Sequence, residues 1–178
     1  MSRKKTLITL VTTLLLAGCT GIPENIKPID DFQLNNYLGT WYEIARLDHS
    51  FEQGLTNVTG QYSLREDGGV QVVNKGFSKE DQEWKIAEGK AYFVNDPDVG
   101  HLKVSFFGPF YSSYVIFDLD TINYHYAFIT SYSKKYLWLL ARTPKVSDEL
   151  MQQFIETART KGFDTQEIIF VEQEPADF

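Results

Sequence analysis

Short runs of alternating apolar and polar residues follow one another along most of this chain, with turn-forming residues between them. The first run begins after Asn35 and Asn36 and continues to Leu47. Alternation along a strand gives it two faces, here Trp41, Glu43 and Ala45 on one and Tyr42, Ile44 and Arg46 on the other. Both faces carry bulky or apolar groups, so we expect this strand to be covered on both sides. A Gly two residues before a Trp at its start suggests a plug at the end of a barrel, although a Gly-Trp turn can occur in any β protein.

Seven further runs have the length and alternation of strands. They cover residues 57–65, 70–77, 84–94, 101–107, 111–119, 124–132 and 136–142. The connections between them are short, which demands antiparallel neighbours, and no helical pattern interrupts the series. The chain is therefore predicted to be all-β with one C-terminal helix, and its eight strands to close into an antiparallel up-and-down barrel. A two-sheet sandwich is the alternative fold.

The spacing of apolar residues changes from that of a strand to that of a helix only after the last of these strands. Ser147 is placed to cap a helix, an apolar stripe from Leu150 to Ala158 recurs at helical spacing, and Gly162 follows as a stop. We expect this helix to pack on the outside of the barrel. A short strand at 168–171 is expected beside the opening strand, followed by a loose acidic tail at 172–178.

The first eighteen residues have the pattern of an export signal. Three basic residues precede an apolar run from Leu7 to Leu16, which is too short to span a bilayer as a mature helix. The tetrad that ends in Cys19, Leu-Ala-Gly-Cys, resembles the lipobox of bacterial lipoproteins, in which the cysteine is acylated and becomes the first residue. An ordinary signal with an incidental cysteine is the alternative. We therefore predict a signal peptide at 1–18, an acylated N-terminus and tether at 19–29, and one domain at 30–178.

The resemblance to lipoproteins also implies a location. Thr20 follows the cysteine, where an Asp would imply retention at the inner membrane, so the outer membrane is expected, with the domain facing the periplasm. Several acyl chains on one residue would anchor the protein stably, since each buried methylene contributes about 0.8 kcal/mol.

The charge and composition of the chain limit the classes of partner that it is expected to bind. Without its signal the chain keeps a domain-sized body, and loss of the three signal-peptide cations takes the formal net charge from −7 to −10. An acidic body argues against nucleic acid as a partner. Aromatic residues make up 15% of the sequence, as apolar pockets and strand-rich folds both favour.

Residues suited to catalysis are scattered. His49, His101 and His125 lack metal-ligand spacing and are interpreted as loop or surface residues. The serines have no Gly-x-Ser-x-Gly setting and there is no phosphate-binding loop. We therefore expect no enzyme activity, no metal and no cofactor.

Three segments resemble the motifs of the lipocalin family. The Gly39-Thr40-Trp41 triplet is similar to the first motif, and Arg142 at the end of the eighth predicted strand matches the third. The segment Asp118-Leu119-Asp120 with Tyr124 resembles the second, although its Thr-Asp-Tyr core is not reproduced cleanly. The resemblance spans the mature domain and, with the lipobox, points to bacterial lipocalin lipoproteins. It implies that Gly39, Trp41 and Arg142 close one end of the barrel, where a guanidinium over an indole face adds about 0.5 to 2 kcal/mol.

Alternation from Trp41 and Arg142, together with this resemblance, predicts the residues that face a ligand. They are Glu43, Tyr62, Val72, Asn74, Ala91, Phe93, Val104, Phe106, Tyr114, Ile116, Ile129, Trp138 and Leu140. The set describes an apolar cavity with phenols at its rim, suited to an acyl chain, and with Asn74 available to a polar head group. A barrel filled by its own side chains is the alternative. Glu43 is the exception among these residues, either neutral, paired with an Arg, or a binder of a cationic head group.

The function expected is that of a lipid-anchored lipocalin that binds, and transports or stores, fatty acids or lysophospholipids for envelope maintenance or stress. Two alternatives remain: a lipocalin-fold enzyme that acts on a lipid, and an envelope scaffold with a filled barrel. The apolar segment Gly108-Pro109-Phe110-Tyr111 is a candidate for contact with a membrane or with a second copy in a homodimer, and turn chemistry accounts for it almost as well.

Overall fold

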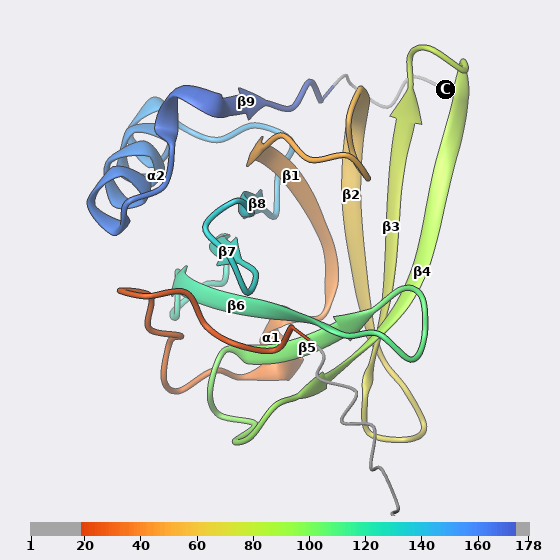
Figure 1. Cartoon of the computed structure of the whole chain (residues 1–178), viewed down its shortest axis with the longest axis vertical. Helices are drawn as coiled ribbons and strands as arrows, with labels where there is room; N and C mark the ends of the chain where they lie inside the picture. The colour runs from red at the N-terminus through yellow and green to blue at the C-terminus, as the bar shows by residue number, and fades with distance from the viewer. Residues whose placement is uncertain (1–18, 174–178) are drawn as a thin grey trace, which may run out of the picture.

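The computed structural model describes residues 19–173 as a β-barrel with one long helix beside it (Figure 1). The predicted signal segment, 1–18, and residues 174–178 lie outside the described part. The eight barrel strands are β1 (Gly39–Leu47), β2 (Leu55–Leu64), β3 (Val70–Ser78), β4 (Glu83–Phe93), β5 (His101–Ser105), β6 (Ser112–Leu119), β7 (Tyr126–Thr130) and β8 (Leu137–Ala141). The other elements are α1 (Leu34–Tyr37), α2 (Asp148–Lys161), the 3₁₀ turn η1 (Thr165–Glu167) and β9 (Ile168–Phe170).

Every barrel strand pairs antiparallel with the next one, and β1 closes the ring. On one side β1 pairs with β2, where Gly39 lies opposite Tyr62; on its other side it pairs with β8, where Tyr42 lies opposite Ala141. The predicted eight-stranded barrel is therefore confirmed. The sandwich alternative is wrong, because one continuous sheet returns to its own first strand.

A β-bulge in β1 corrects the predicted faces of that strand. The pairing with β8 passes from Glu43 opposite Leu140 to Ala45 opposite Leu139, which leaves Ile44 as an extra residue. Ile44 and Ala45 consequently both lie in the apolar cluster outside the barrel. After the bulge Arg46 lies opposite Trp138, on the interior side with Glu43. The strict alternation that grouped Ala45 with Trp41 and Arg46 with Tyr42 was wrong at these two positions.

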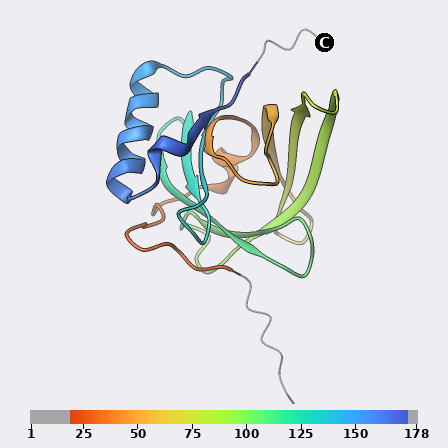
Figure 2. The same ribbon diagram turned by 45° about the horizontal axis from the view of Figure 1, so that its top comes forward.

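The helix α2 covers the outside of the barrel, as predicted (Figure 2). The Ser147 hydroxyl accepts a hydrogen bond from the Leu150 amide at its start, and Gly162 ends it at φ +81°. Its buried residues, Phe154 and Ala158, pack against the outer cluster of barrel residues. Among residues 19–173, no helix is both long and apolar enough to cross a membrane.

Both ends of the described chain are bound to the barrel. The segment predicted as a tether lies along β6, where the Ser113 amide donates to the Cys19 carbonyl oxygen at 2.9 Å and the Ile29 amide donates to Ile116. At the other end, β9 pairs with β1 as expected. The tail predicted to be loose is held at its start, since the Gln173 side chain donates to the carbonyl oxygens of Glu43 and Val58.

Candidate ligand-binding cavity

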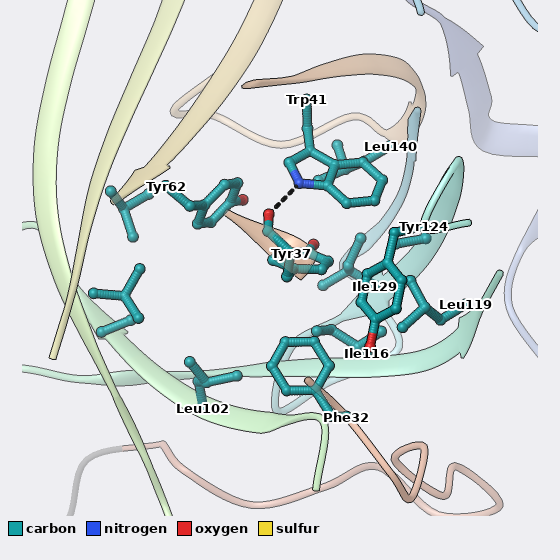
Figure 3. Close-up of a cluster of buried hydrophobic side chains, with 14 residues drawn as sticks. Phe32, Tyr37, Trp41, Tyr62, Leu102, Ile116, Leu119, Tyr124, Ile129 and Leu140 are labelled. Carbon is teal, nitrogen blue, oxygen red and sulfur yellow. Dashed lines mark hydrogen bonds between the residues drawn. The ribbon is translucent and has the colours of Figure 1, made fainter. Parts of the chain in front are cut away.

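One end of the barrel is closed by Trp41 and the groups around it (Figure 3). The indole is fully buried, and its Nε1 donates to the Tyr37 carbonyl oxygen at 2.7 Å. The guanidinium carbon of Arg142 lies 3.9 Å from the centroid of the Trp41 ring. This stacking places the cation over the negative face of the indole and leaves the N–H groups of the guanidinium free to donate in its plane.

Those N–H groups bind the chain that crosses the closed end. Arg142 donates to the carbonyl oxygens of Asn36, Leu38 and Thr40 at 2.7 to 2.9 Å. Gly39 lies between these acceptors at φ +98°, and a Cβ built there would be 3.4 Å from Nη1 of Arg142. A glycine is needed mainly for its backbone conformation, since side chains rarely adopt this φ.

Three phenols lie on the barrel interior directly above this closure. The Tyr114 hydroxyl is 2.7 Å from that of Tyr37 and 2.9 Å from that of Tyr62. Burial raises the pKa of each of the three hydroxyls, which therefore stay protonated at neutral pH. Phenols had been predicted at the rim of the cavity. For Tyr62 and Tyr114 that prediction was wrong, because Tyr62 pairs with Gly39 at the closed end, and they form the floor.

Above the phenols the barrel holds a cavity of about 570 Å³. Its volume is within the range of about 300 to 1,000 Å³ that is usual for small-molecule sites, so the barrel is not filled by its own side chains. Eleven of the residues predicted to face a ligand line it: Glu43, Tyr62, Val72, Asn74, Ala91, Val104, Phe106, Tyr114, Ile129, Trp138 and Leu140. Phe106 folds inward because Gly89 opposite it has no side chain; a Cβ there would be 2.8 Å from the Phe106 ring.

The two other predicted residues do not line the cavity. Phe93 ends β4 at the closed end and packs edge-on against Phe32, with ring centroids 6.0 Å apart. Ile116 is fully buried in the same cluster, where it packs against the backbone of Gly100. Both belong to the packed core beneath the floor, because β5 and β6 continue below the cavity.

The opposite end of the barrel is open, and loop residues that the strand pattern did not select form its mouth. Since β1 begins at the closed end, the loops β1–β2, β3–β4, β5–β6 and β7–β8 all lie at the other end. Phe51, Phe107, Phe110 and Tyr132 from these loops line the mouth. Phe110 lies in the Gly108–Tyr111 segment that had been singled out, whereas Phe107 and Tyr132 had been placed at the ends of predicted strands that in the structure stop at Ser105 and Thr130.

A buried polar cluster interrupts the apolar wall between floor and mouth. Arg46 donates to the Glu43 carboxylate at 2.7 Å and to the Glu52 carbonyl oxygen at 2.7 Å. The Glu52 carboxylate accepts from the Trp138 indole N–H at 3.1 Å and lies 3.2 Å from Nε2 of His49. Of the three roles considered for Glu43, the structure shows pairing with an arginine. Arg46 and Glu52 were not predicted, since the bulge brings the first inward and a loop supplies the second.

Burial governs the ionisation of Glu43. It raises the pKa of the Glu43 carboxyl well above its ordinary value; the neighbouring Glu52 raises it further, and Arg46 opposes both effects. The raised pKa favours the protonated form of the Glu43 carboxyl, which lies beside the Arg46 guanidinium.

The histidines had been predicted to be loop or surface residues, which is wrong for His101; His49 does lie in a loop, the one between β1 and β2, but its side chain is largely buried. The His49 side chain is only 6% exposed and stacks on Phe51 at 3.9 Å between ring centroids. His101 is buried on β5, 3.3 Å from the Ser113 hydroxyl, and only His125 is largely exposed. Within residues 19–173, no group of three or more His, Cys, Asp or Glu side chains gathers as metal ligands would.

The chain matches known proteins over nearly all of this structure. The family model of the lipocalin-like domain matches residues 32–173. A Vibrio cholerae protein named outer membrane lipoprotein Blc is 58% identical over 165 residues, covering 93% of this chain and 96% of that protein. The protein of the same name from Escherichia coli K12 is 48% identical over 151 residues, 85% of each chain.

Solved structures agree on the fold. Insecticyanin from the tobacco hornworm Manduca sexta superposes with a TM-score of 0.68 at 21% identity, over 87% of each chain. The cockroach allergen Per a 4 gives a TM-score of 0.68 at 19% identity, over 87% of this chain and 96% of that one. At this level of identity the likeness establishes the barrel architecture alone.

Proposed function

Because this chain belongs to the lipocalin family, we propose that it binds a fatty acid or a lysophospholipid in the barrel cavity and carries or stores it for the cell envelope. The observation that carries the proposal is the cavity itself: about 570 Å³, walled mainly by apolar side chains, closed below by Trp41 and Arg142 and open above. An apolar space with one mouth fits the apolar end of a long molecule better than a compact polar molecule.

Burial of the acyl chain supplies the affinity. Each methylene removed from water contributes about 0.8 kcal/mol, and a micromolar dissociation constant corresponds to about 8 kcal/mol. About ten buried methylenes would therefore supply micromolar binding, and the cost of ordering the chain requires somewhat more. Most of a long acyl chain has to enter the cavity.

The polar cluster supports entry of the chain tail first. An anionic head group beside this cluster would face the carboxyl groups of Glu43 and Glu52, whereas Lys75 and Lys85 line the cavity toward its mouth, near the open ends of β3 and β4. At the mouth the head group keeps its hydration. The floor phenols and Asn74 offer the bound chain few polar partners, as suits a methyl-terminated tail.

The chain is a lipid-anchored protein of the outer membrane, like its relatives that are named outer membrane lipoprotein Blc. Its maturation follows as part of the proposal: residues 1–18 are removed, Cys19 is acylated, and the domain from residue 30 onward faces the periplasm. The same relatives are named as lipoproteins and not as enzymes, and we propose no catalytic step in the cavity.

Displacement of a fluorescent fatty acid tests the proposal. A lysophospholipid with a long chain should displace the probe at micromolar concentration, and one with a six-carbon chain should need a far higher concentration. Native mass spectrometry of the purified protein should show one lipid per barrel. A barrel that takes up no probe would contradict the proposal and favour a scaffold, whereas conversion of the added lipid would favour an enzyme.

A further inference from the structure

The start of the mature chain lies at the mouth of the cavity rather than on a free tether. The Cys19 carbonyl oxygen accepts from the Ser113 amide, and the Ser113 hydroxyl donates to the Gly21 carbonyl oxygen at 2.6 Å. Cys19 also bridges to Ser112, the first residue of β6, and is among the residues that line the mouth. In Figure 1 this red segment lies next to the β6 ribbon. Since paired strands are about 4.8 Å apart, acyl chains on Cys19 would begin within a few ångströms of the barrel rim.

Exposed aromatic side chains surround that point. Phe107 is 81% exposed and Phe110 is 69% exposed, both in the β5–β6 loop that leads into Ser112. Tyr132, in the β7–β8 loop, is 40% exposed. Large apolar side chains gathered at one edge of a water-soluble barrel mark a surface made for an apolar partner.

The charge of this edge differs from that of the closed end, while the two other open-end loops, 48–54 and 79–82, hold four acidic residues against Lys79. The β5–β6 and β7–β8 loops contain no acidic residue and carry Lys134 and Lys135. The three turns at the closed end, 65–69, 94–100 and 120–125, hold five acidic residues against one arginine. A bilayer with anionic lipids would therefore attract the first edge and repel the other end.

We propose that the edge formed by Cys19, Phe107, Phe110 and Tyr132 inserts into the bilayer surface and holds the cavity mouth against the membrane. The inference extends the proposed function, because it lets a lipid pass from the bilayer into the barrel without crossing water. Phe107 and Phe110 sit at the level of the head groups beside the anchor, and the acidic closed end points into the periplasm.

Probe depth in vesicles tests this orientation. The acylated protein is reconstituted in vesicles of phosphatidylethanolamine and phosphatidylglycerol that contain doxyl-labelled lipid. An environment-sensitive fluorophore is attached through Phe107→Cys or, as a matched control, through Ile122→Cys, which is 86% exposed at the closed end. We expect blue-shifted emission and at least threefold stronger quenching at position 107 than at position 122. Equal and weak quenching at both positions would overturn the proposal.

A second set of variants separates insertion from simple proximity. With the fluorophore at Ser133→Cys in the neighbouring loop, the double change Phe107→Asp with Phe110→Asp should reduce quenching to the level of the closed-end control. Ile122→Asp should leave it unchanged. A blue shift at position 107 without quenching by doxyl lipid would mean that a second copy of the chain covers this edge, and would also overturn the proposal. The measurement needs no lipid in the cavity, so its outcome is independent of the displacement assay.

Discussion

The guanidinium of Arg142 lies 3.9 Å from the centroid of the Trp41 indole, at the point where the chain crosses the end of the barrel. The two residues are about a hundred positions apart in the sequence, and they join the first barrel strand, β1, to the end of the eighth, β8. Arg142 also donates to three carbonyl oxygens of the segment that crosses the closed end. One side chain therefore contacts both the buried indole and the chain that covers this end of the barrel.

Replacing this arginine tests the closure. Arg142→Lys keeps the charge but loses the planar fork, so most of its hydrogen bonds to Asn36, Leu38 and Thr40 cannot form. At about 1 kcal/mol for each lost bond, the free energy of unfolding should fall by about 2 to 4 kcal/mol in urea titrations. Arg159→Lys, on the exposed face of α2, is the matched control and should change it by less than about 0.5 kcal/mol. Equal effects would contradict the role given to Arg142.

The partner of that arginine should matter at least as much. Trp41→Ala removes a fully buried indole, for which large-to-small changes cost about 3 to 5 kcal/mol. At about 2 to 4 °C for each kcal/mol, the melting temperature followed by circular dichroism should drop by about 10 °C. An unchanged melting temperature would mean that Trp41 is not a plug.

Glycine at position 39 is predicted to be required for its backbone angle. Gly39→Ala puts a Cβ on a residue with φ +98° and should reduce the free energy of unfolding by about 1 to 3 kcal/mol. Gly21→Ala meets no atom within 4 Å and serves as the control. A Gly39→Ala variant as stable as the control in urea would refute this explanation.

The cavity can be blocked without disturbing the strands. Ala87 lines the cavity and is exposed, so Ala87→Trp should occupy ligand space and weaken the binding of a fluorescent fatty acid at least tenfold. Glu88→Trp places the same ring on the opposite face of β4 and should leave the dissociation constant unchanged. Similar affinities in the two variants would place the ligand outside the barrel.

The polar cluster predicts how stability depends on pH. The pKa of Glu43 is raised by burial in the folded state, so the folded protein binds more protons than the unfolded chain above an ordinary carboxyl pKa of 4.5. The contribution of Glu43 to the free energy of unfolding is therefore complete below about pH 4.5 and is lost as the pH rises through the raised pKa. Glu43→Gln should flatten this decline between pH 5 and 8 in urea titrations, whereas Glu88→Gln, which is exposed, should not. An unaltered slope in Glu43→Gln would show that the carboxyl is ionised throughout.

The local pattern of apolar and polar residues was sufficient to predict the strands, the long helix and most of the residues that line the cavity. Alternation placed eleven residues correctly on the cavity wall. A strand can turn only one of its two faces inward, and the wrong choice would expose its core residues to water. The helix from Ser147 to Gly162 was predictable for a similar reason, since its cap and its stop are adjacent in the chain.

The tertiary structure decided what depends on contacts between distant segments. The bulge at Ile44 brings Arg46 to Glu43, and a loop brings Glu52 beside them, because two buried carboxyl groups need a cation and donors that no local pattern specifies. Phe93 and Ile116 lie in the packed core beneath the cavity and not in its wall. The depth at which this packing ends depends on side chains from several strands, so the pattern of one strand does not predict it. The sequence by itself determined a lipid-anchored barrel with an apolar interior. Only the folded chain placed Cys19 against β6 at the open end, because that position depends on hydrogen bonds between segments more than ninety residues apart.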